Sequence, residues 1–329
     1  MKAIVYTEYG PPEVLHLKEV SKPAPKNDEV RIRVRAVEAT KSDCEMRSFR
    51  YSVKWFWLPL RIALGVRKPR RPILGSYFAG EVESVGEDVR GFSQGDAVFG
   101  CARLRMGAYG EYVVLPANYT IASKPSNMSF AEAAAVPLGG LNALHFMRRA
   151  KIRAGERVLI NGAGGSIGAY AVQLAKSMGA AVTAVDHAGK ETALRRFGAD
   201  EFIDYRAQDF TASGQTYDVI FDMVPGSSYS ACIGALNPNG RYLSGNPRLA
   251  VMLRSVLTTR FTGKTALFAF ARESRRELLS LKEMIEDRKI GSIVDSVYPM
   301  EQVVDAHRRV ESEQRVGAVM IAIAQGSDD

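Results

Sequence analysis

A glycine-rich turn between two apolar runs constrains this chain more than any other feature. Residues 157–161 have an apolar centre at 158–160, glycines follow at positions 162, 165 and 168, and the next apolar residues recur at helical spacing. This order predicts a buried strand that passes through a tight turn into a helix, whose N-terminus presents free backbone N–H groups. A second apolar run, residues 180–185, ends in Asp186. The complete strand–helix–strand unit favours binding of a dinucleotide.

Each glycine of the turn has a mechanical reason. Gly162 opens the tight turn, Gly165 lets the backbone approach the phosphates, and Gly168 lets the helix pack close to the strand. The predicted contacts to the cofactor therefore include the whole loop: Gly162, Ala163, Gly164, Gly165, Ser166, Ile167 and Gly168. The alternative interpretation is an ordinary turn between a strand and a helix.

Length and charge restrict the class of protein. The 329 residues, 46% apolar and 24% charged, suffice for two domains with substantial cores. The net charge of +8 comes from basic residues scattered among acidic ones, which suits a polyanionic cofactor and equally well mere solubility. We find no nucleic-acid-binding motif.

Cysteine usage and the start of the chain bear on the compartment. Cys44, Cys101 and Cys232 are few, odd in number and far apart, which favours a reducing compartment over a disulfide framework. The first residues already read as a strand, and no apolar run is long enough to span a bilayer. We expect a cytoplasmic protein.

Two kinds of pattern divide the chain. Residues 1–125 carry short β-branched runs punctuated by Gly and Pro, which predicts a mostly β, barrel-like domain. Ser129, with Glu132 at capping-box spacing, begins a helix, and strand and helix signals then alternate to about residue 264. The fold class is therefore α/β: a barrel-like domain from 1–125 and 265–329, and a doubly wound parallel sheet over 126–264.

Several further motifs, in a fixed order, identify a family resemblance. They are the segments 2–5, 75–82, 107–113, 136–144 and 198–205, together with the glycine turn. With these motifs the chain resembles the medium-chain dehydrogenase/reductase superfamily, in particular its zinc-free, ζ-crystallin-like quinone oxidoreductase branch. The resemblance covers nearly the whole length. It implies a GroES-like catalytic domain beside a Rossmann domain, and a homodimer.

The residues at the zinc positions of this superfamily predict that no metal is bound. Where alcohol dehydrogenases have a zinc-binding Cys and a His-Glu pair, this chain has Thr40 and Ser76-Tyr77, and no Cys lies near residues 138–140. Hydroxyl groups are poor zinc ligands. Without a Lewis acid, the suitable acceptors are those that take a hydride readily, namely quinones and α,β-unsaturated carbonyls.

The resemblance implies an NAD(P)H-dependent reductase of a small hydrophobic quinone or enone. The alternative is a non-catalytic NADPH-binding protein, crystallin-like or RNA-binding. In the family's substrate site, Asp43, Arg47 and Tyr51 match, whereas Thr40 replaces an Asn and Glu45 replaces a Tyr. We expect Tyr51 to hydrogen-bond the substrate carbonyl, with packing in an aromatic loop as the alternative and water as a source of the proton.

The choice between NADPH and NADH depends on opposing residues. Asp186 would accept a hydrogen bond from the ribose 2′-hydroxyl and repel a 2′-phosphate, which favours NADH. Lys190 and Tyr205 match residues that hold the 2′-phosphate in zinc-free relatives, so we expect NADPH, with NADH as the alternative. The remaining predicted cofactor contacts are Asn142, Gly245 and Asn246.

Two other segments are unusual. Residues 51–71 contain Trp55 and Trp57 followed by basic residues, and we interpret them as a lid or as packing rather than as a membrane contact. Four basic residues lie along an apolar helix, where a solvated face is expected: Arg248, Arg254, Arg260 and Lys264.

Overall fold

The computed structural model describes residues 1–51, 61–62, 64–245, 249–268 and 273–323. The chain forms two compact units, which we call unit 1 (Met1–Leu138 with Glu273–Asp329) and unit 2 (Gly139–Arg272). Within the described residues no helix is long and apolar enough to cross a membrane. All three cysteines are buried and free.

Unit 1 is built on a mostly antiparallel sheet of seven strands in the order β14-β15-β3-β4-β5-β7, with β6 paired to β3. Alternate residues of β3, among them Val30, Ile32 and Val34, are completely buried and form the core. β1 (Lys2–Val5) and β2 (His16–Glu19) form a separate pair. The strands of the sheet are β3 (Glu29–Ala39), β4 (Tyr77–Val85), β5 (Ala97–Cys101), β6 (Tyr112–Pro116), β7 (Thr120–Ser123), β14 (Val294–Pro299) and β15 (Ala318–Ala322).

Unit 1 also contains short helices. Ser129 caps α3 (Phe130–Ala134): its hydroxyl accepts from the Glu132 N–H at 3.3 Å and the Glu132 carboxylate accepts from the Ser129 N–H at 2.9 Å, which confirms the predicted capping box. The other helices are α1 (Lys41–Ser48), α9 (Arg275–Glu286), α10 (Val303–Glu311) and the 3₁₀ turns η1 (Pro12–Val14), η3 (Arg103–Arg105) and η6 (Met300–Gln302).

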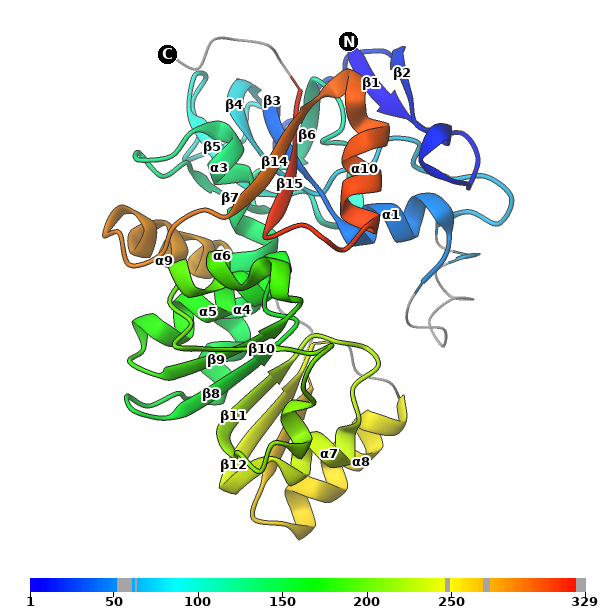
Figure 1. Cartoon of the computed structure of the whole chain (residues 1–329). Helices are drawn as coiled ribbons and strands as arrows, with labels where there is room; N and C mark the ends of the chain where they lie inside the picture. Colours follow the sequence, from blue (N-terminus) through cyan, green and yellow to red (C-terminus); the bar gives the residue numbers. More distant parts are fainter. Residues whose placement is uncertain (52–60, 63, 246–248, 269–272, 324–329) are drawn as a thin grey trace. The chain divides into compact units, whose positions relative to one another are not determined.

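Unit 2 is a parallel sheet in the order β10-β9-β8-β11-β12-β13. The order reverses between β8 and β11, so right-handed crossovers place α5 and α6 on one face and α7 and α8 on the other, as Figure 1 shows. The strands are β8 (Arg157–Asn161), β9 (Ala181–Asp186), β10 (Glu201–Asp204), β11 (Tyr217–Asp222), β12 (Leu236–Ser244) and β13 (Thr265–Phe268). The helices are α4 (Val136–Ala150), α5 (Ser166–Ser177), α6 (Glu191–Arg196), α7 (Tyr229–Gly234) and α8 (Leu249–Phe261), with 3₁₀ turns η4 (Ala188–Lys190) and η5 (Phe210–Ala212).

The predicted fold class is confirmed, but both domain boundaries move along the chain. α3 packs on β3 and β4, so the residues from 126 to 138 belong to unit 1. β13 pairs in parallel with β12, Thr265 opposite Arg241, so residues 265–268 belong to unit 2 rather than to the returning segment. Periodicity reports the type of an element, whereas a boundary depends on what that element packs against.

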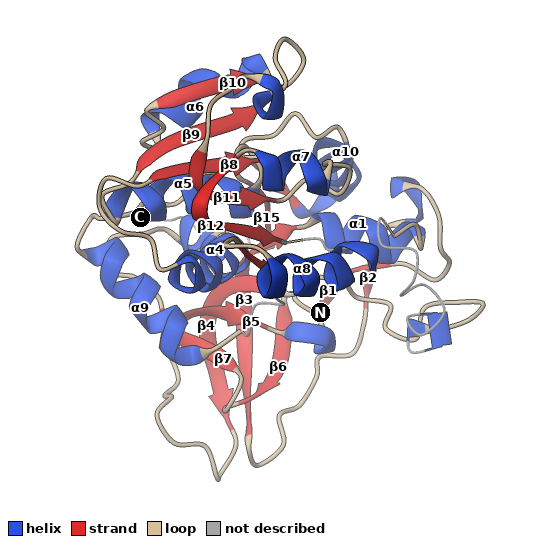
Figure 2. Ribbon diagram, turned by 90° about the horizontal axis from the view of Figure 1, so that it is seen from below, coloured by secondary structure: helices blue, strands red, loops and turns tan. Residues whose placement is uncertain are grey.

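The exposed surface of α8 differs from the solvated, basic face that the sequence predicted. Arg254 and Arg260 are exposed as predicted, and Arg248 lies outside the described residues. Five large apolar residues of the helix are exposed as well, by 51–72%, and Ser255 is its buried residue: Leu249, Leu253, Val256, Leu257 and Phe261. The exposed surface of α8 is therefore largely apolar. Figure 2 shows this helix from below.

Candidate functional site

The glycine turn of unit 2 lies at the carboxyl end of β8, and the structure separates the roles of its glycines. Gly162 has a φ of +81°, which favours glycine in the turn. A Cβ atom on Gly168 would lie 2.2 Å from the Gly162 carbonyl oxygen, so helix and turn require a glycine there. A Cβ on Gly165 would meet nothing nearer than that oxygen, at 3.8 Å. The space beside Gly165 is open.

The N-terminus of α5 follows this open space. Gly165 is the N-cap and provides no side chain for capping, so the first N–H groups of the helix are free to bind an anion. Ser166 Oγ is buried and has no hydrogen-bond partner among the described residues. Ala163 and Gly164 are buried and Ile167 is half-buried. An oxyanion would satisfy both the backbone donors and the serine hydroxyl, so the residues fit a cofactor phosphate.

Asp186 and Lys190 lie against this turn and bind each other. Asp186 Oδ2 accepts from the Gly164 N–H at 2.7 Å, and Asp186 Oδ1 lies 2.9 Å from Lys190 Nζ. Only 7% of Asp186 and 8% of Lys190 is exposed. The lysine stem crosses the turn so closely that a Cβ on Gly164 would lie 2.4 Å from Lys190 Cδ. The two residues predicted to oppose each other are thus an ion pair.

The other predicted cofactor residues are distributed around the same edge of the sheet. The Tyr205 N–H donates to the Asp186 carbonyl at 3.3 Å, and the Tyr205 side chain is exposed. The Gly245 N–H donates to the Asp222 carbonyl at 3.0 Å at the end of β12. Asn142 is half-buried on α4. Asn246 lies outside the described residues.

A buried polar cluster that the sequence analysis missed joins the ends of three strands. Asn161 Nδ2 donates to Asp222 Oδ1 at 2.9 Å, and the Tyr242 hydroxyl donates to Asp222 Oδ2 at 2.8 Å. Burial raises the pKa of the Asp222 carboxyl, against these hydrogen bonds. The signal was present, since an apolar strand that ends in Asp places a carboxyl group at this edge.

In unit 1, the predicted substrate residues Thr40 and Asp43 form the N-terminus of α1. Asp43 Oδ2 accepts from the Thr40 hydroxyl at 2.6 Å and the Thr40 N–H at 3.0 Å, while Thr40 Oγ1 accepts from the Asp43 N–H. Asp43 Oδ1 accepts from the Gly75 N–H at 3.2 Å. Asp43 is completely buried, which raises the pKa of its carboxyl. Both side chains act as a capping box.

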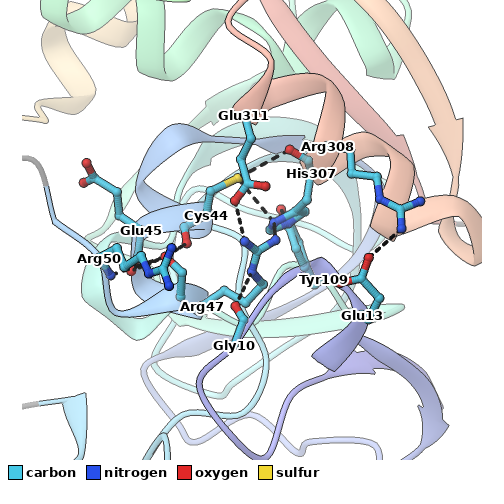
Figure 3. A network of polar contacts seen from close by, with 11 residues as sticks. Gly10, Glu13, Cys44, Glu45, Arg47, Arg50, Tyr109, His307, Arg308 and Glu311 are labelled. Carbon is cyan, nitrogen blue, oxygen red and sulfur yellow. Dashed lines mark hydrogen bonds and ion pairs between the residues drawn. The ribbon is translucent and has the colours of Figure 1, made fainter.

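Arg47, at the other end of α1, is 1% exposed and surrounded by partners (Figure 3). Its Nε donates to the Gly10 carbonyl at 3.2 Å, its Nη1 lies 3.3 Å from His307 Nδ1, and its Nη2 forms an ion pair with Glu311. Because a guanidinium only donates, His307 Nδ1 accepts, so Nε2 carries the proton and donates to the Tyr109 hydroxyl at 3.0 Å. Burial and the nearby Arg47 lower the pKa of His307 to about 3.

These contacts give Thr40, Asp43 and Arg47 structural roles, and the hypothesis that they face a substrate together with Tyr51 stays a prediction. The three are buried and bonded within unit 1, and the partners of Arg47 on α10 are more than 250 positions away in sequence, beyond the reach of local motifs. Tyr51 differs. Its ring stands edge-on to Phe49 with centroids 5.2 Å apart, and its buried hydroxyl has no partner among the described residues. Burial also raises the pKa of Tyr51.

The hydroxyls at the superfamily's zinc positions are engaged in unit 1. The Tyr77 hydroxyl donates to Glu273 Oε1 at 2.8 Å, and the Ser76 hydroxyl donates to the Arg103 carbonyl at 3.1 Å. Burial raises the pKa of both Tyr77 and Glu273. Within the part of the chain that the structure describes, no three His, Cys, Asp or Glu side chains gather as a metal site. Residues Trp55 and Trp57 lie outside that part.

Comparisons with known proteins agree with this architecture. Residues 26–126 match the family model of the alcohol dehydrogenase GroES-like domain, and residues 197–321 match that of a zinc-binding dehydrogenase. The chain is 30% identical to the quinone oxidoreductase of Rattus norvegicus over 98% of both chains. It is 29% identical to the 2-methylene-furan-3-one reductase of Solanum lycopersicum, over 98% of this chain and 79% of that one. The solved quinone oxidoreductase of Coxiella burnetii, 27% identical, superimposes with a TM-score of 0.86 over 98% of this chain and 99% of that one.

Proposed function

This chain belongs to the medium-chain dehydrogenase/reductase superfamily, and we propose that within it the protein is an NADPH-dependent reductase of quinones or α,β-unsaturated carbonyls that needs no metal. The observation that carries the proposal is the glycine turn, which is open at Gly165 and is followed by the N-terminus of α5 and by a Ser166 hydroxyl without a hydrogen-bond partner among the described residues. The similar proteins include quinone oxidoreductases and a reductase whose named substrate is a conjugated ketone.

The residues of unit 2 would hold the cofactor by its phosphates. The α5 N-terminus and Ser166 Oγ would bind the pyrophosphate, and Gly162 and Gly168 keep the turn close to the strand. Bound NADPH supplies a hydride to an electron-poor carbon. Asp222 and its partners fix the strand ends that carry the turn, so the donors are already oriented before the cofactor arrives.

The ion pair of Asp186 with Lys190 supports NADPH rather than NADH. Asp186 already accepts from Gly164 and His187 and is neutralised by Lys190, so it is a weaker acceptor for a ribose hydroxyl and a weaker source of repulsion. Lys190 can exchange the carboxylate for a 2′-phosphate. Lys190→Ala should therefore weaken binding of NADPH by roughly tenfold or more, while NADH should bind at least as tightly as to the wild type, because Asp186 loses its ion-pair partner and can accept from the ribose hydroxyl. Calorimetry that shows tighter binding of NADH to the wild type would contradict the assignment.

Tyr51 is the proposed hydrogen-bond donor to the substrate oxygen. A hydride that arrives at the conjugated carbon of an enone, or at a quinone, places negative charge on oxygen, and a phenol that has no hydrogen-bond partner among the described residues can stabilise it. The raised pKa of Tyr51 keeps this phenol protonated and able to donate at neutral pH. Water can then supply the proton that completes the reduction.

We also propose a homodimer formed through unit 2. β13 is the last strand of the sheet, no other described strand pairs with its outer edge, and the α8 helix before it exposes five large apolar residues. A second copy could pair along the strand and cover the helix. Leu253→Asp, at a residue 70% exposed, should yield folded monomers in light scattering, whereas Leu104→Asp, at one 72% exposed in unit 1, should not. A dimeric Leu253→Asp protein would exclude this interface.

The function is tested by oxidation of NADPH and NADH with a panel of quinones and short enones, before and after treatment with a chelator. We expect turnover with NADPH that survives the chelator. NADPH binding without turnover of any acceptor would favour the non-catalytic alternative. Turnover that is lost on chelation and restored by zinc would exclude the metal-free mechanism.

A further inference from the structure

Unit 1 contains a cavity of about 440 Å³ that is widely open to solvent, at the end of its sheet where β3 begins and β6 ends. Its polar lining consists of three cations and two carboxylates: Lys26, Arg71, Arg105, Asp28 and Glu29. We propose that this cavity binds a small organic anion, a carboxylate attached to a compact apolar body. The inference does not depend on the reductase activity, because none of these residues belongs to the proposed cofactor or substrate sites.

Arg105 is the fixed element of the cavity. Glu29 is 4% exposed; its Oε1 lies 2.7 Å from Arg105 Nη2, and its Oε2 accepts from the Lys26 N–H at 3.0 Å. The buried carboxylate therefore orients the guanidinium. Arg105 Nη1 is buried and has no hydrogen-bond partner among the described residues. A buried donor without an acceptor is unfavourable, so a ligand toward which the Arg105 side chain can turn Nη1 would be bound favourably.

The remaining charges favour a monoanion. Glu29 is neutralised by Arg105, which leaves Lys26 and Arg71 opposite the single carboxylate of Asp28. Neither Lys26 nor Arg71 forms an ion pair with another residue that the structure describes. Arg71 Nη1 instead donates to the Leu104 carbonyl, which ties this cation to the turn that carries Arg105. One added negative charge balances the site.

The other walls of the cavity are apolar and aromatic. Leu104, 72% exposed, lies on the same turn as Arg105, and Pro116 and Tyr119 complete the lining. The cavity volume lies at the lower end of the range typical of small-molecule sites. A free inorganic anion would leave these walls wet, whereas an aryl or branched alkyl carboxylate would cover them. These three residues form the smaller part of the lining, and they favour an organic anion over phosphate, which would contact the cations alone.

The test uses the full-length protein, with benzoate as the probe and benzyl alcohol and inorganic phosphate as comparisons, by titration calorimetry. We expect saturable binding of benzoate that is tighter than that of either comparison. Lys26→Gln and Arg71→Gln, which leave the Glu29 pair intact, should each weaken benzoate by a few fold, and Arg105→Gln by roughly tenfold or more. Arg90→Gln, an exposed arginine elsewhere in unit 1, should leave it unchanged.

Three outcomes of these titrations would overturn the proposal. These are the absence of saturable benzoate binding, equal binding by the wild type and the Lys26→Gln and Arg71→Gln variants, and phosphate binding tighter than benzoate. A repeat with excess NADPH locates the benzoate. Unchanged affinity supports a site apart from the cofactor, whereas competition assigns the benzoate to the cofactor site and also overturns the proposal. Because Arg105→Gln removes the partner of a buried carboxylate, a failure of that variant to fold leaves the Lys26 and Arg71 variants to decide.

Discussion

The glycine turn of unit 2 and helix α1 of unit 1 both carry motifs that resemble functional sites, but their polar groups differ in whether they have hydrogen-bond partners within the protein. At the turn, the N-terminal donors of α5 and the Ser166 hydroxyl have no protein partners within the described residues. At α1, Thr40, Asp43 and Arg47 are buried and bonded to their own unit. The first region can therefore bind a ligand, whereas the side chains of the second stabilise the fold of unit 1.

The difference shows which kinds of sequence motif indicate a binding site and which have other structural explanations. A glycine motif functions through backbone geometry, and a positive φ at Gly162 or a close approach at Gly168 has few alternative explanations. A motif of Asp, Arg and Thr functions through side chains, which can equally well cap a helix or join an ion pair. Variants at both regions can break this comparison.

The largest effect is expected for Gly165→Val. The new side chain would occupy the open space at the turn, where its Cβ would lie 3.8 Å from the Gly162 carbonyl oxygen and meet no nearer atom, so unit 2 should fold while a phosphate is excluded. Loss of several charge-assisted hydrogen bonds should weaken NADPH binding by roughly a thousandfold. Calorimetry with NADPH, and circular dichroism for the fold, measure the two consequences.

Gly234→Val is the matched control, because Gly234 lies at the end of α7 before β12 and a Cβ there meets nothing within 4 Å. Its affinity for NADPH should equal that of the wild type. If Gly165→Val folds and still binds NADPH normally, the open space is not the phosphate site, and the contrast between the two regions disappears.

For Arg47→Gln, we expect the effect to fall on stability. The variant removes the ion pair with Glu311 and leaves the Gly10 carbonyl and His307 without their donor, at a cost of roughly 2–4 kcal/mol in the free energy of unfolding. Urea denaturation measures this cost, and steady-state kinetics in the absence of urea should show KM nearly unchanged. A stable variant with a greatly raised KM would instead indicate that Arg47 contacts the substrate.

The sequence predicted the fold where local patterns decide it. The alternating residues of β3, the capping box at Ser129 and the strand ends at Asp186 all follow from the chain itself. The sequence did not predict the contacts of Arg47 with His307 and Glu311, because these two residues follow the whole of unit 2 in the chain. It also did not predict the ion pair of Asp186 with Lys190. The first depends on tertiary packing. The second has the i,i+4 spacing of an ion pair, but the two residues were predicted to act separately, each on the cofactor.

Tyr51→Phe sharpens the comparison within unit 1, because Tyr51 is the one predicted substrate residue whose hydroxyl lacks a partner in the described structure. Turnover of enones should fall by roughly a hundredfold, since a single donor to the developing enolate is lost. Quinones should be affected less, because their charge spreads over an aromatising ring. Ratios of kcat/KM for one enone and one quinone measure the difference. Equal, small losses would assign Tyr51 to packing against Phe49.

The smallest expected effect concerns the pH dependence of stability, and it tests whether the network around Arg47 is a structural one. The pKa of His307 is lowered from 6.5 to about 3, so in the folded protein its ring stays neutral while in the unfolded chain it binds a proton. Stability should therefore decrease as pH falls below 6.5, by about 1.4 kcal/mol per pH unit until the folded-state pKa is approached. His307→Gln can still hydrogen-bond Arg47 and Tyr109 but does not titrate, so urea denaturation between pH 7 and pH 5 should show a shallower slope for this variant. Identical slopes in the two proteins would mean that His307 takes up its proton when folded, which requires water or a mobile carboxylate beside it. The region around α1 would then be open, as the glycine turn is, and the contrast between the two regions would have to be abandoned.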